Sequence, residues 1–382
     1  MNLLKQFSAR FSKIEPLPEG THHKQAMDDQ KPYRLHLRLQ KNGSGVLIVN
    51  ASTILQLNPT AAEYAFHFIK GTSPEEVAKQ VAARYRVDKK IALADFNSFA
   101  ERIHTLISTP DLDPVSFLEF ERASPHSTDL ASPLRLDCAL TYALPHDSQT
   151  EYAPVKRVDR ELATEEWQTI LDRAWQVGIP QIVFTGGEAT LREDLPDLIA
   201  HAEKNGQVCG LLTDGLKLTD KNYLEILLQT GLDHVMVILQ PGDSRSWQAI
   251  QAILKEDLFL TVHLTINKEN VTEAGNILQK LANFGVENIS LSTSDDTLLD
   301  ELLELQSVAS SLQLTLRWDL PVPYSASHPV SFEMQDEEIP SGAGKAWMYV
   351  EPDGDVLPAQ GEADKVLGNF LRSDWETIFK VG

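Results

Sequence analysis

The chain has 382 residues, of which 42% are hydrophobic, and its formal net charge at pH 7 is −21. This length and composition indicate a globular protein of two or three domains and exclude wholesale disorder. So acidic a surface repels phosphate backbones and anionic lipids, and nucleic acid is therefore not an expected partner. It would favour a basic peptide or protein, although solubility alone is the simpler explanation of the charge.

The chain contains only two cysteines, Cys138 and Cys209. Two cysteines exclude a disulfide framework and fit a reducing, cytoplasmic location. They are also too few for a site built from three or four thiolates. Because no apolar stretch approaches the roughly 20 residues needed to cross a bilayer, stable membrane insertion is not expected.

The N-terminal third predicts a small domain preceded by a tail. Residues 1–32 are interpreted as a tail and linker, because residues 15–32 are polar and rich in turn formers. Short alternating strands are then expected over 33–39, 45–50 and 53–57, followed by helices near 58–69, 73–85 and 92–107. Three strands and three helices predict a winged-helix-like α+β domain over residues 33–108.

A second linker is expected at residues 109–133, which contain four prolines. From residue 134 the pattern alternates between strands and helices, which predicts a parallel sheet curled into a partial (β/α)6 TIM-like barrel over residues 134–325. A small extension is expected at 326–382. The strands are expected near 134–141, 181–186, 207–213, 233–239, 258–266 and 288–293, and the helices near 164–177, 194–204, 220–230, 244–254 and 272–284.

The sharpest local motif is the run FTGGEATLREDL, where a strand leads directly into Gly186, Gly187 and Glu188. Glycines allow a ligand to approach the backbone closely, and α/β proteins place ligand groups at the carboxyl ends of strands. The alternative is a tight turn with an exposed glutamate. Asp214 ends a later strand in the run LLTDG.

The first run resembles the glycine-glycine-glutamate motif of radical S-adenosylmethionine (SAM) enzymes, in which the glutamate binds the amino group of SAM. The run LLTDG resembles the family's LxTNG strand end, with Asp214 in place of asparagine. The resemblance implies a residual SAM-like pocket formed by Gly186, Gly187, Glu188 and Asp214.

The same family carries a CxxxCxxC loop after its first barrel strand, and the three thiolates hold a four-iron, four-sulfur cluster. The residues that match these cysteines here are Leu144, Ser148 and Glu151. The C-terminal run GAGKAWMYVEPDGDVLPAQ is similar to the SPASM-type extension, which holds auxiliary clusters. Ser341 and Ala359 stand at two of its cysteine positions. The resemblance with these substitutions implies no iron–sulfur cluster and weak SAM binding at best.

The N-terminal module, with its run ILQLNPTAAEYAFHFIKG, is similar to the small peptide-chaperone domain of pyrroloquinoline quinone biosynthesis. That resemblance implies that the leader of a precursor peptide adds a strand to the sheet edge and rests against the third helix. The expected groove residues are Ile54, Leu55, Leu57, Phe96, Phe99 and Ile103. The alternative is that the helical residues form the domain's core.

These resemblances lead to one main hypothesis and two alternatives. The main one is a non-catalytic, radical-SAM-like protein that binds a precursor peptide or a partner protein while a ribosomally made peptide or a peptide-derived cofactor matures. The first alternative is a cluster-free enzyme that uses Glu188, Asp214 and His146 as acid or base groups. The second is a structural subunit that partners an active radical SAM homologue. A zinc site at His146, Asp147 and Glu151 is less favoured than a solvated loop.

Overall fold

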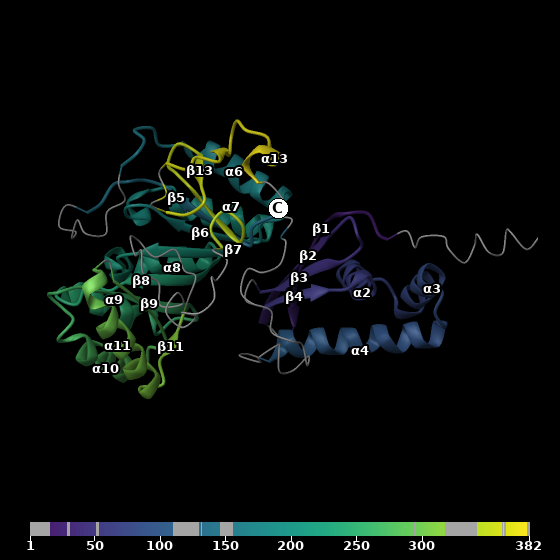
Figure 1. Cartoon of the computed structure of the whole chain (residues 1–382), viewed down its shortest axis with the longest axis horizontal. Coiled ribbons are helices and arrows are strands. Elements are labelled where there is room, and N and C mark those ends of the chain that lie inside the picture. Colours follow the sequence, from purple (N-terminus) through teal and green to yellow (C-terminus); the bar gives the residue numbers. More distant parts are fainter. Residues whose placement is uncertain are drawn as a thin grey trace, which may run out of the picture. The chain divides into compact units, whose positions relative to one another are not determined.

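The computed structural model describes residues 16–28, 31–50, 53–109, 130, 132–145, 156–293, 295–317, 342–360, 362 and 364–379. The chain divides into two compact units, residues 1–122 and residues 123–382 (Figure 1). Most of the expected linker 109–133 lies outside the described residues. Among the helices of the described residues, none is long and apolar enough to cross a membrane.

The first unit is a four-stranded antiparallel sheet with three helices. The strands lie side by side in chain order: β1 (Gly20–Asp28), β2 (Lys31–Leu39), β3 (Gly45–Val49) and β4 (Thr53–Leu57). The helices are α2 (Pro59–Lys70), α3 (Pro74–Tyr85) and α4 (Lys89–Ser108). The three strands and three helices expected from the sequence are therefore confirmed.

One face of this sheet packs against α2 and the C-terminal half of α4. The buried cluster between them is formed by Tyr33, Leu35, Leu37, Leu39, Leu47, Val49, Leu55, Leu57, Ala62, Ala65, Ile69, Ile103, Leu106 and Ile107. Burying a leucine side chain contributes about 1.5–3 kcal/mol, so this cluster fixes how the helices lie on the sheet. The strand alternation of the sequence correctly identified the inward-facing leucines of β2.

The prediction of a tail and linker over residues 1–32 is wrong for residues 20–28, because these residues form the edge strand β1. Its run GTHHKQAMD pairs along its whole length with β2, from Gly20 opposite Leu39 to Asp28 opposite Lys31. Because an edge strand is held mainly by backbone pairing, it needs no apolar alternation. On this strand, the ring of His22 lies 4.8 Å from the ring of Phe66 on α2.

The second unit is built on a ten-stranded sheet in the order β11-β10-β9-β8-β7-β6-β5-β12-β13-β14. Its parallel part is β5 (Arg135–Ala139), β6 (Gln181–Thr185), β7 (Val208–Thr213), β8 (Leu232–Ile238), β9 (Phe259–Ile266), β10 (Asn288–Thr293) and β11 (Thr315–Leu316). Helices follow the strands: α6 (Thr164–Gln176), α7 (Leu195–Asn205), α8 (Lys221–Gln229), α9 (Ser244–Ile253), α10 (Ala274–Phe284) and α11 (Leu299–Ser311). This is the expected partial α/β barrel, and each strand and helix listed for it in the sequence is confirmed.

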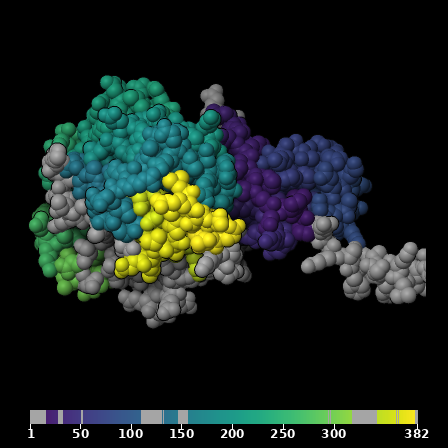
Figure 2. All heavy atoms as spheres, turned by 90° about the horizontal axis from the view of Figure 1, so that it is seen from above, coloured from purple at the N-terminus to yellow at the C-terminus, as the bar shows by residue number. Residues whose placement is uncertain are grey.

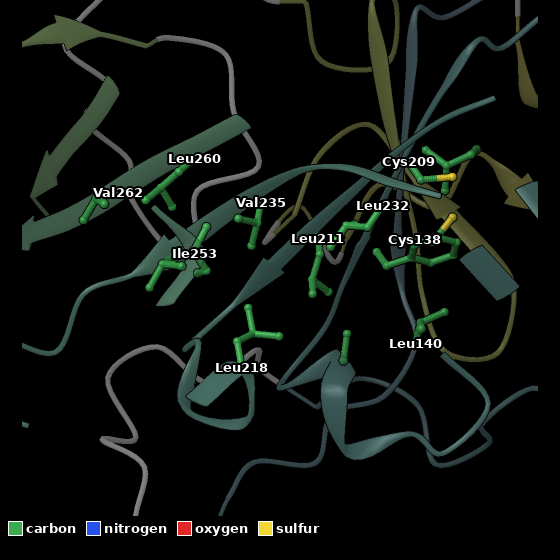
Figure 3. Packing of buried hydrophobic residues seen from close by; sticks show 14 of the residues in the cluster. Cys138, Leu140, Cys209, Leu211, Leu218, Leu232, Val235, Ile253, Leu260 and Val262 are labelled. Atoms are coloured by element: carbon green, nitrogen blue, oxygen red, sulfur yellow. The ribbon is translucent and has the colours of Figure 1, made fainter. Parts of the chain in front are cut away.

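A large buried cluster fills the space between the sheet and the helices. It includes both cysteines, Cys138 on β5 and Cys209 on β7, among leucine, isoleucine and valine side chains (Figure 3). Alternate residues of the same strands point to the other, inner face of the barrel. On that face Val183, Leu212 and Met236 form a separate small cluster.

The C-terminal extension continues the barrel sheet. Strand β12 (Trp347–Val350) pairs in parallel with β5, and β13 (Asp355–Leu357) and β14 (Gly368–Asn369) follow as antiparallel neighbours. The short helix α13 (Trp375–Ile378) ends the described chain. Figure 2 shows the extension, in yellow, lying against earlier residues of the barrel in blue and teal. The hairpin expected around Pro352-Asp-Gly354 is confirmed.

Candidate functional site

The double glycine after β6 packs against the chain itself. The backbone N–H of Gly187 donates to the carbonyl of Thr141 at 2.7 Å, and that of Glu188 donates to the carbonyl of Ala143 at 2.8 Å. A Cβ atom on Gly186 would lie 2.3 Å from the Thr141 carbonyl oxygen, and one on Gly187 would lie 2.2 Å from that of Ala143. The packing of residues 141–143 therefore requires both glycines, whereas the sequence suggested the approach of a ligand.

Glu188 joins the ends of β6 and β7. Its side chain is buried, and its Oε1 atom accepts from the Thr190 N–H at 2.9 Å and from the Thr213 hydroxyl at 2.8 Å. Its Oε2 atom accepts from the Asp214 N–H at 2.8 Å. Three hydrogen bonds hold the buried carboxylate in place between the two strand ends. The exposed glutamate of the alternative interpretation is excluded.

Asp214 and Lys217 complete this edge of the barrel. The Asp214 Oδ1 atom accepts from the Leu216 N–H at 2.9 Å. The Lys217 ammonium donates to the Thr190 carbonyl at 2.6 Å and lies 4.2 Å from the centre of the Tyr223 ring. Burial, with the Glu188 charge, raises the pKa of Tyr223. The four residues expected to form a pocket thus lie together, while Lys217 and Tyr223 were missed because helical periodicity gave them no distinctive signal.

The inner face of the barrel carries further polar groups that the sequence did not single out. Arg135 and Asp137 on β5 form an ion pair of 2.8 Å. The imidazole of His263 on β9 contacts the hydroxyls of Ser290 at 3.1 Å and Ser292 at 3.0 Å on β10. Burial raises the pKa of Asp137 even though Arg135 opposes that shift. From the sequence, only the alternation of side chains along each strand could have placed these residues on one face.

His234 on β8 also faces this inner side. Its Nε2 atom lies 3.2 Å from the side-chain nitrogen of Gln181. A Cβ atom on Gly210 would lie 2.1 Å from the His234 ring, so the glycine makes room for it. Burial lowers the pKa of His234 to about 4, which keeps the ring neutral at pH 7.

The expected groove residues of the first unit divide between core and surface. Leu55, Leu57 and Ile103 are buried in the cluster between sheet and helices, and Phe96 is buried in a second cluster between α3 and α4. Phe99 is partly buried against both clusters. The core alternative therefore holds for Phe96 and Ile103. Ile54 differs, because it is 41% exposed on β4, an edge strand of the described sheet.

Two of the five residues at former cluster positions are described. Leu144 is half-buried directly after the segment that packs on Gly187, and Ala359 is half-buried after β13. Neither side chain has an atom that can bind iron. Ser148, Glu151 and Ser341 lie outside the described residues, as do His146 and Asp147 of the less favoured zinc site.

Comparison with known proteins relates part of the chain to a family model and most of it to known folds. Residues 138–259 match the model of the Radical SAM superfamily. The whole chain is similar in fold to Streptococcus suis SuiB, with a TM-score of 0.59 and 15% identity over 89% of this chain and 86% of that one. SuiB bound to its precursor peptide SuiA gives a TM-score of 0.60 at 14% identity, over 92% of this chain and 87% of that chain. The chain therefore has the radical SAM partial-barrel fold with an N-terminal antiparallel domain and a C-terminal extension, as SuiB has.

Individual relatives narrow the comparison. A PqqA peptide cyclase of Streptomyces rochei is 32% identical over 151 residues, which are 36% of this chain and 41% of that protein. A PqqA peptide cyclase of Granulibacter bethesdensis is 25% identical over 254 residues, which are 59% of this chain and 67% of that protein. The chain thus spans less than half of the first of these relatives. Both relatives are named PqqA peptide cyclase, and this chain is similar to part of each.

Radical SAM proteins normally use an iron–sulfur cluster, and the donor set here can be tested against that group. Both cysteine side chains are fully buried, and burial together with Asp137 raises the pKa of the Cys138 thiol well above its usual value. The Cys209 Sγ atom lies 3.7 Å from the Ile199 carbonyl of α7. A cluster held by three thiolates of this chain does not fit two cysteines that point into the helix-side core. No chemical step is therefore derived through such a cluster.

Proposed function

We propose that this protein binds a precursor peptide during the maturation of a ribosomally made peptide or peptide-derived cofactor, and that it carries out no radical chemistry itself. One contrast supports the proposal: the first unit has an uncharged edge strand with an exposed Ile54, while the chain has only two cysteines and both are buried. Relatives named PqqA peptide cyclase, and the fold shared with SuiB, support peptide maturation as the setting.

Strand β4 supports the binding half of the proposal. Its run Thr53-Ile-Leu-Gln-Leu57 has no charged residue and no proline, and Ile54 is exposed on it. Soluble proteins usually protect an edge strand with charge, proline or a bulge, so an uncharged edge is suited to pairing with another strand. The opposite edge, β1, carries Lys24 and Asp28. Within the described sheet, β4 is therefore the more receptive edge.

Peptide binding can be tested with a pair of matched variants. The probes are fluorescein-labelled synthetic peptides made from the short open reading frames beside the gene, measured by fluorescence anisotropy. Ile54→Lys places a charge on β4 and is expected to weaken binding by about tenfold, which corresponds to about 1.4 kcal/mol. Met27→Lys makes the same change at an exposed residue of β1 and is expected to leave binding within about twofold. Equal losses in both variants would reject β4 as the binding edge.

The catalytic half has its own test. The purified protein is reconstituted anaerobically with iron and sulfide, incubated with SAM and dithionite, and assayed for deoxyadenosine. We expect no stoichiometric cluster bands in the visible spectrum and no deoxyadenosine. A stoichiometric cluster with deoxyadenosine formation would refute the proposal.

A second candidate is a cluster-free enzyme, and the polar inner face of the barrel favours it. His263 lies between two serine hydroxyls, and Asp137 lies on the same face with a raised pKa. Such groups can transfer protons to or from a substrate that binds beside them. The candidate predicts a change in peptide mass after incubation with the purified protein, abolished by His263→Asn. An unchanged mass with every peptide that binds would reject it.

A further inference from the structure

A single carboxylate connects both ends of the segment that follows β5. The Tyr142 hydroxyl, just before this segment, donates to Glu351 Oε1 at 2.7 Å. Arg157, just after it, donates through Nε to Glu351 Oε2. Glu351 lies between β12 and β13, so a residue of the C-terminal extension joins two positions that are 15 residues apart in the chain.

Arg157 faces further acidic side chains of the same hairpin. Its Nη2 atom lies 2.7 Å from Asp355 Oδ2 and 3.9 Å from Asp353 Oδ1. The Glu351 side chain is only 5% exposed, while that of Arg157 is 23% exposed. A buried carboxylate is costly without a partner, so the arginine fork compensates a charge that the extension would otherwise leave unpaired.

The first end of the segment is also fixed by the barrel. The Thr141 hydroxyl donates to Glu161 at 2.6 Å, and the carbonyls of Thr141 and Ala143 accept from the Gly187 and Glu188 N–H groups. Although burial would lower the pKa of Arg157, its hydrogen bonds to Asp355 and Glu351 raise it, so the guanidinium stays charged. The contacts thus form one network between the first barrel strand and the extension.

We infer that Arg157 and Glu351 form a metal-free clasp, which fastens the C-terminal extension to the barrel beside β5. The matching segment of radical SAM enzymes, by the resemblance described above, is held by thiolates on iron. In this chain a hydrogen bond and an ion pair join Tyr142 and Arg157, on either side of that segment, to Glu351. The inference does not depend on peptide binding, and its consequence is that attachment of the extension to the barrel does not require iron.

The test compares two neighbouring arginines. Arg157→Gln removes the clasp, whereas Arg160→Gln removes only an exposed ion pair with Glu166. All tryptophans of the chain lie in the second unit, so tryptophan fluorescence follows the unfolding of that unit alone. They are Trp167, Trp175, Trp247, Trp318, Trp347 and Trp375. We expect Arg157→Gln to lower Tm by about 5–10 °C and Arg160→Gln to change it by about 1 °C or less.

Two further measurements keep the inference falsifiable if Arg157→Gln does not fold. Arg157→Lys retains the charge but loses the fork, and it should fold with an intermediate Tm. Wild-type protein from iron-depleted medium and protein reconstituted with iron and sulfide should have equal Tm values. A Tm that rises on reconstitution, or equal losses in the variants at 157 and 160, would overturn the clasp. Neither result bears on the Ile54→Lys binding experiment, so the clasp and the proposed peptide binding fail separately.

Discussion

Glu188 shows how a residue of a ligand-binding motif can be kept for the fold. Its carboxylate accepts from Thr190, Thr213 and Asp214 and so joins two adjacent strand ends. Two of these donors are the backbone N–H groups of Thr190 and Asp214. The glutamate of the motif therefore has a structural role of its own, because its removal would destabilise the barrel edge.

The hydrogen bonds of Glu188 predict that removal of its carboxylate destabilises the protein. Glu188→Ala should lower the free energy of unfolding by about 2–4 kcal/mol, since it leaves several buried donors unsatisfied. Glu193→Ala, at an exposed position five residues later, should change it by about 0.5 kcal/mol or less. Urea unfolding followed by tryptophan fluorescence measures both. Similar values for the two variants would show that the Glu188 contacts contribute little.

His234 predicts a pH dependence in the second unit. Its pKa is about 4 in the folded protein and 6.5 as an ordinary histidine, so between these values the unfolded chain binds a proton that the native chain does not. Stability should therefore fall as the pH falls from about 6.5 toward about 4. His234→Gln should reduce this slope when Tm is followed by tryptophan fluorescence. His23 has a similarly lowered pKa, but it lies in the unit without tryptophan. An unchanged slope in the variant would contradict this assignment.

At the scale of elements, sequence patterns predicted most of the regular structure, but not β1, helix α11 or the short strand β11. The barrel strands are short, largely buried segments between amphipathic helices, and such local signals suffice to locate them. Strand β1 escaped because its side chains are polar and its stability depends on backbone pairing with β2. The closeness of Glu188 and Asp214 was predictable, since parallel strands place their carboxyl ends at one edge. The contact of Arg157 with Glu351 was not, because these residues are far apart in the chain and no local pattern relates them.

Helix α2 provides a test of a local signal. The Asn58 side chain accepts from the Ala61 N–H at 2.9 Å and caps the helix, as its sequence indicated. Asn58→Ala should destabilise this end by about 1 kcal/mol, whereas Asn58→Asp should keep the cap. Hydrogen–deuterium exchange over residues 59–70 should then accelerate about fivefold in the first variant only, if exchange there follows opening of the helix. Equal exchange in both variants would mean that tertiary packing alone holds the helix end.

On the scale of the whole molecule, the charge is divided very unevenly. Residues 1–122 contain 16 Lys and Arg against 14 Asp and Glu, while residues 123–382 contain 18 against 41. The first unit therefore has a net charge of +2 and the second of −23. Even if every basic residue of the second unit were paired with an acidic one, more than half of its acidic residues would have no basic partner. These remaining acidic residues would repel one another.

This imbalance predicts that salt stabilises the second unit. Raising NaCl from 10 to 200 mM at pH 7 should raise its Tm by about 2–4 °C, because screening weakens repulsion between the acidic side chains. The rise should be smaller at pH 4.5, where part of the carboxylates are protonated. Tryptophan fluorescence again reports this unit alone. A Tm that falls with added salt at pH 7 would mean that ion pairs outweigh the repulsion.

The position of β5 inside the sheet has a consequence for synthesis of the chain on the ribosome. One neighbour of β5 is β6, but the other is β12, whose residues 347–350 are made more than two hundred residues later. Until those residues emerge, the growing chain exposes an unpaired strand edge at the start of its barrel, and such edges promote aggregation. A premature stop anywhere before β12 would leave that edge open permanently, so truncated products of this gene should be insoluble or rapidly degraded.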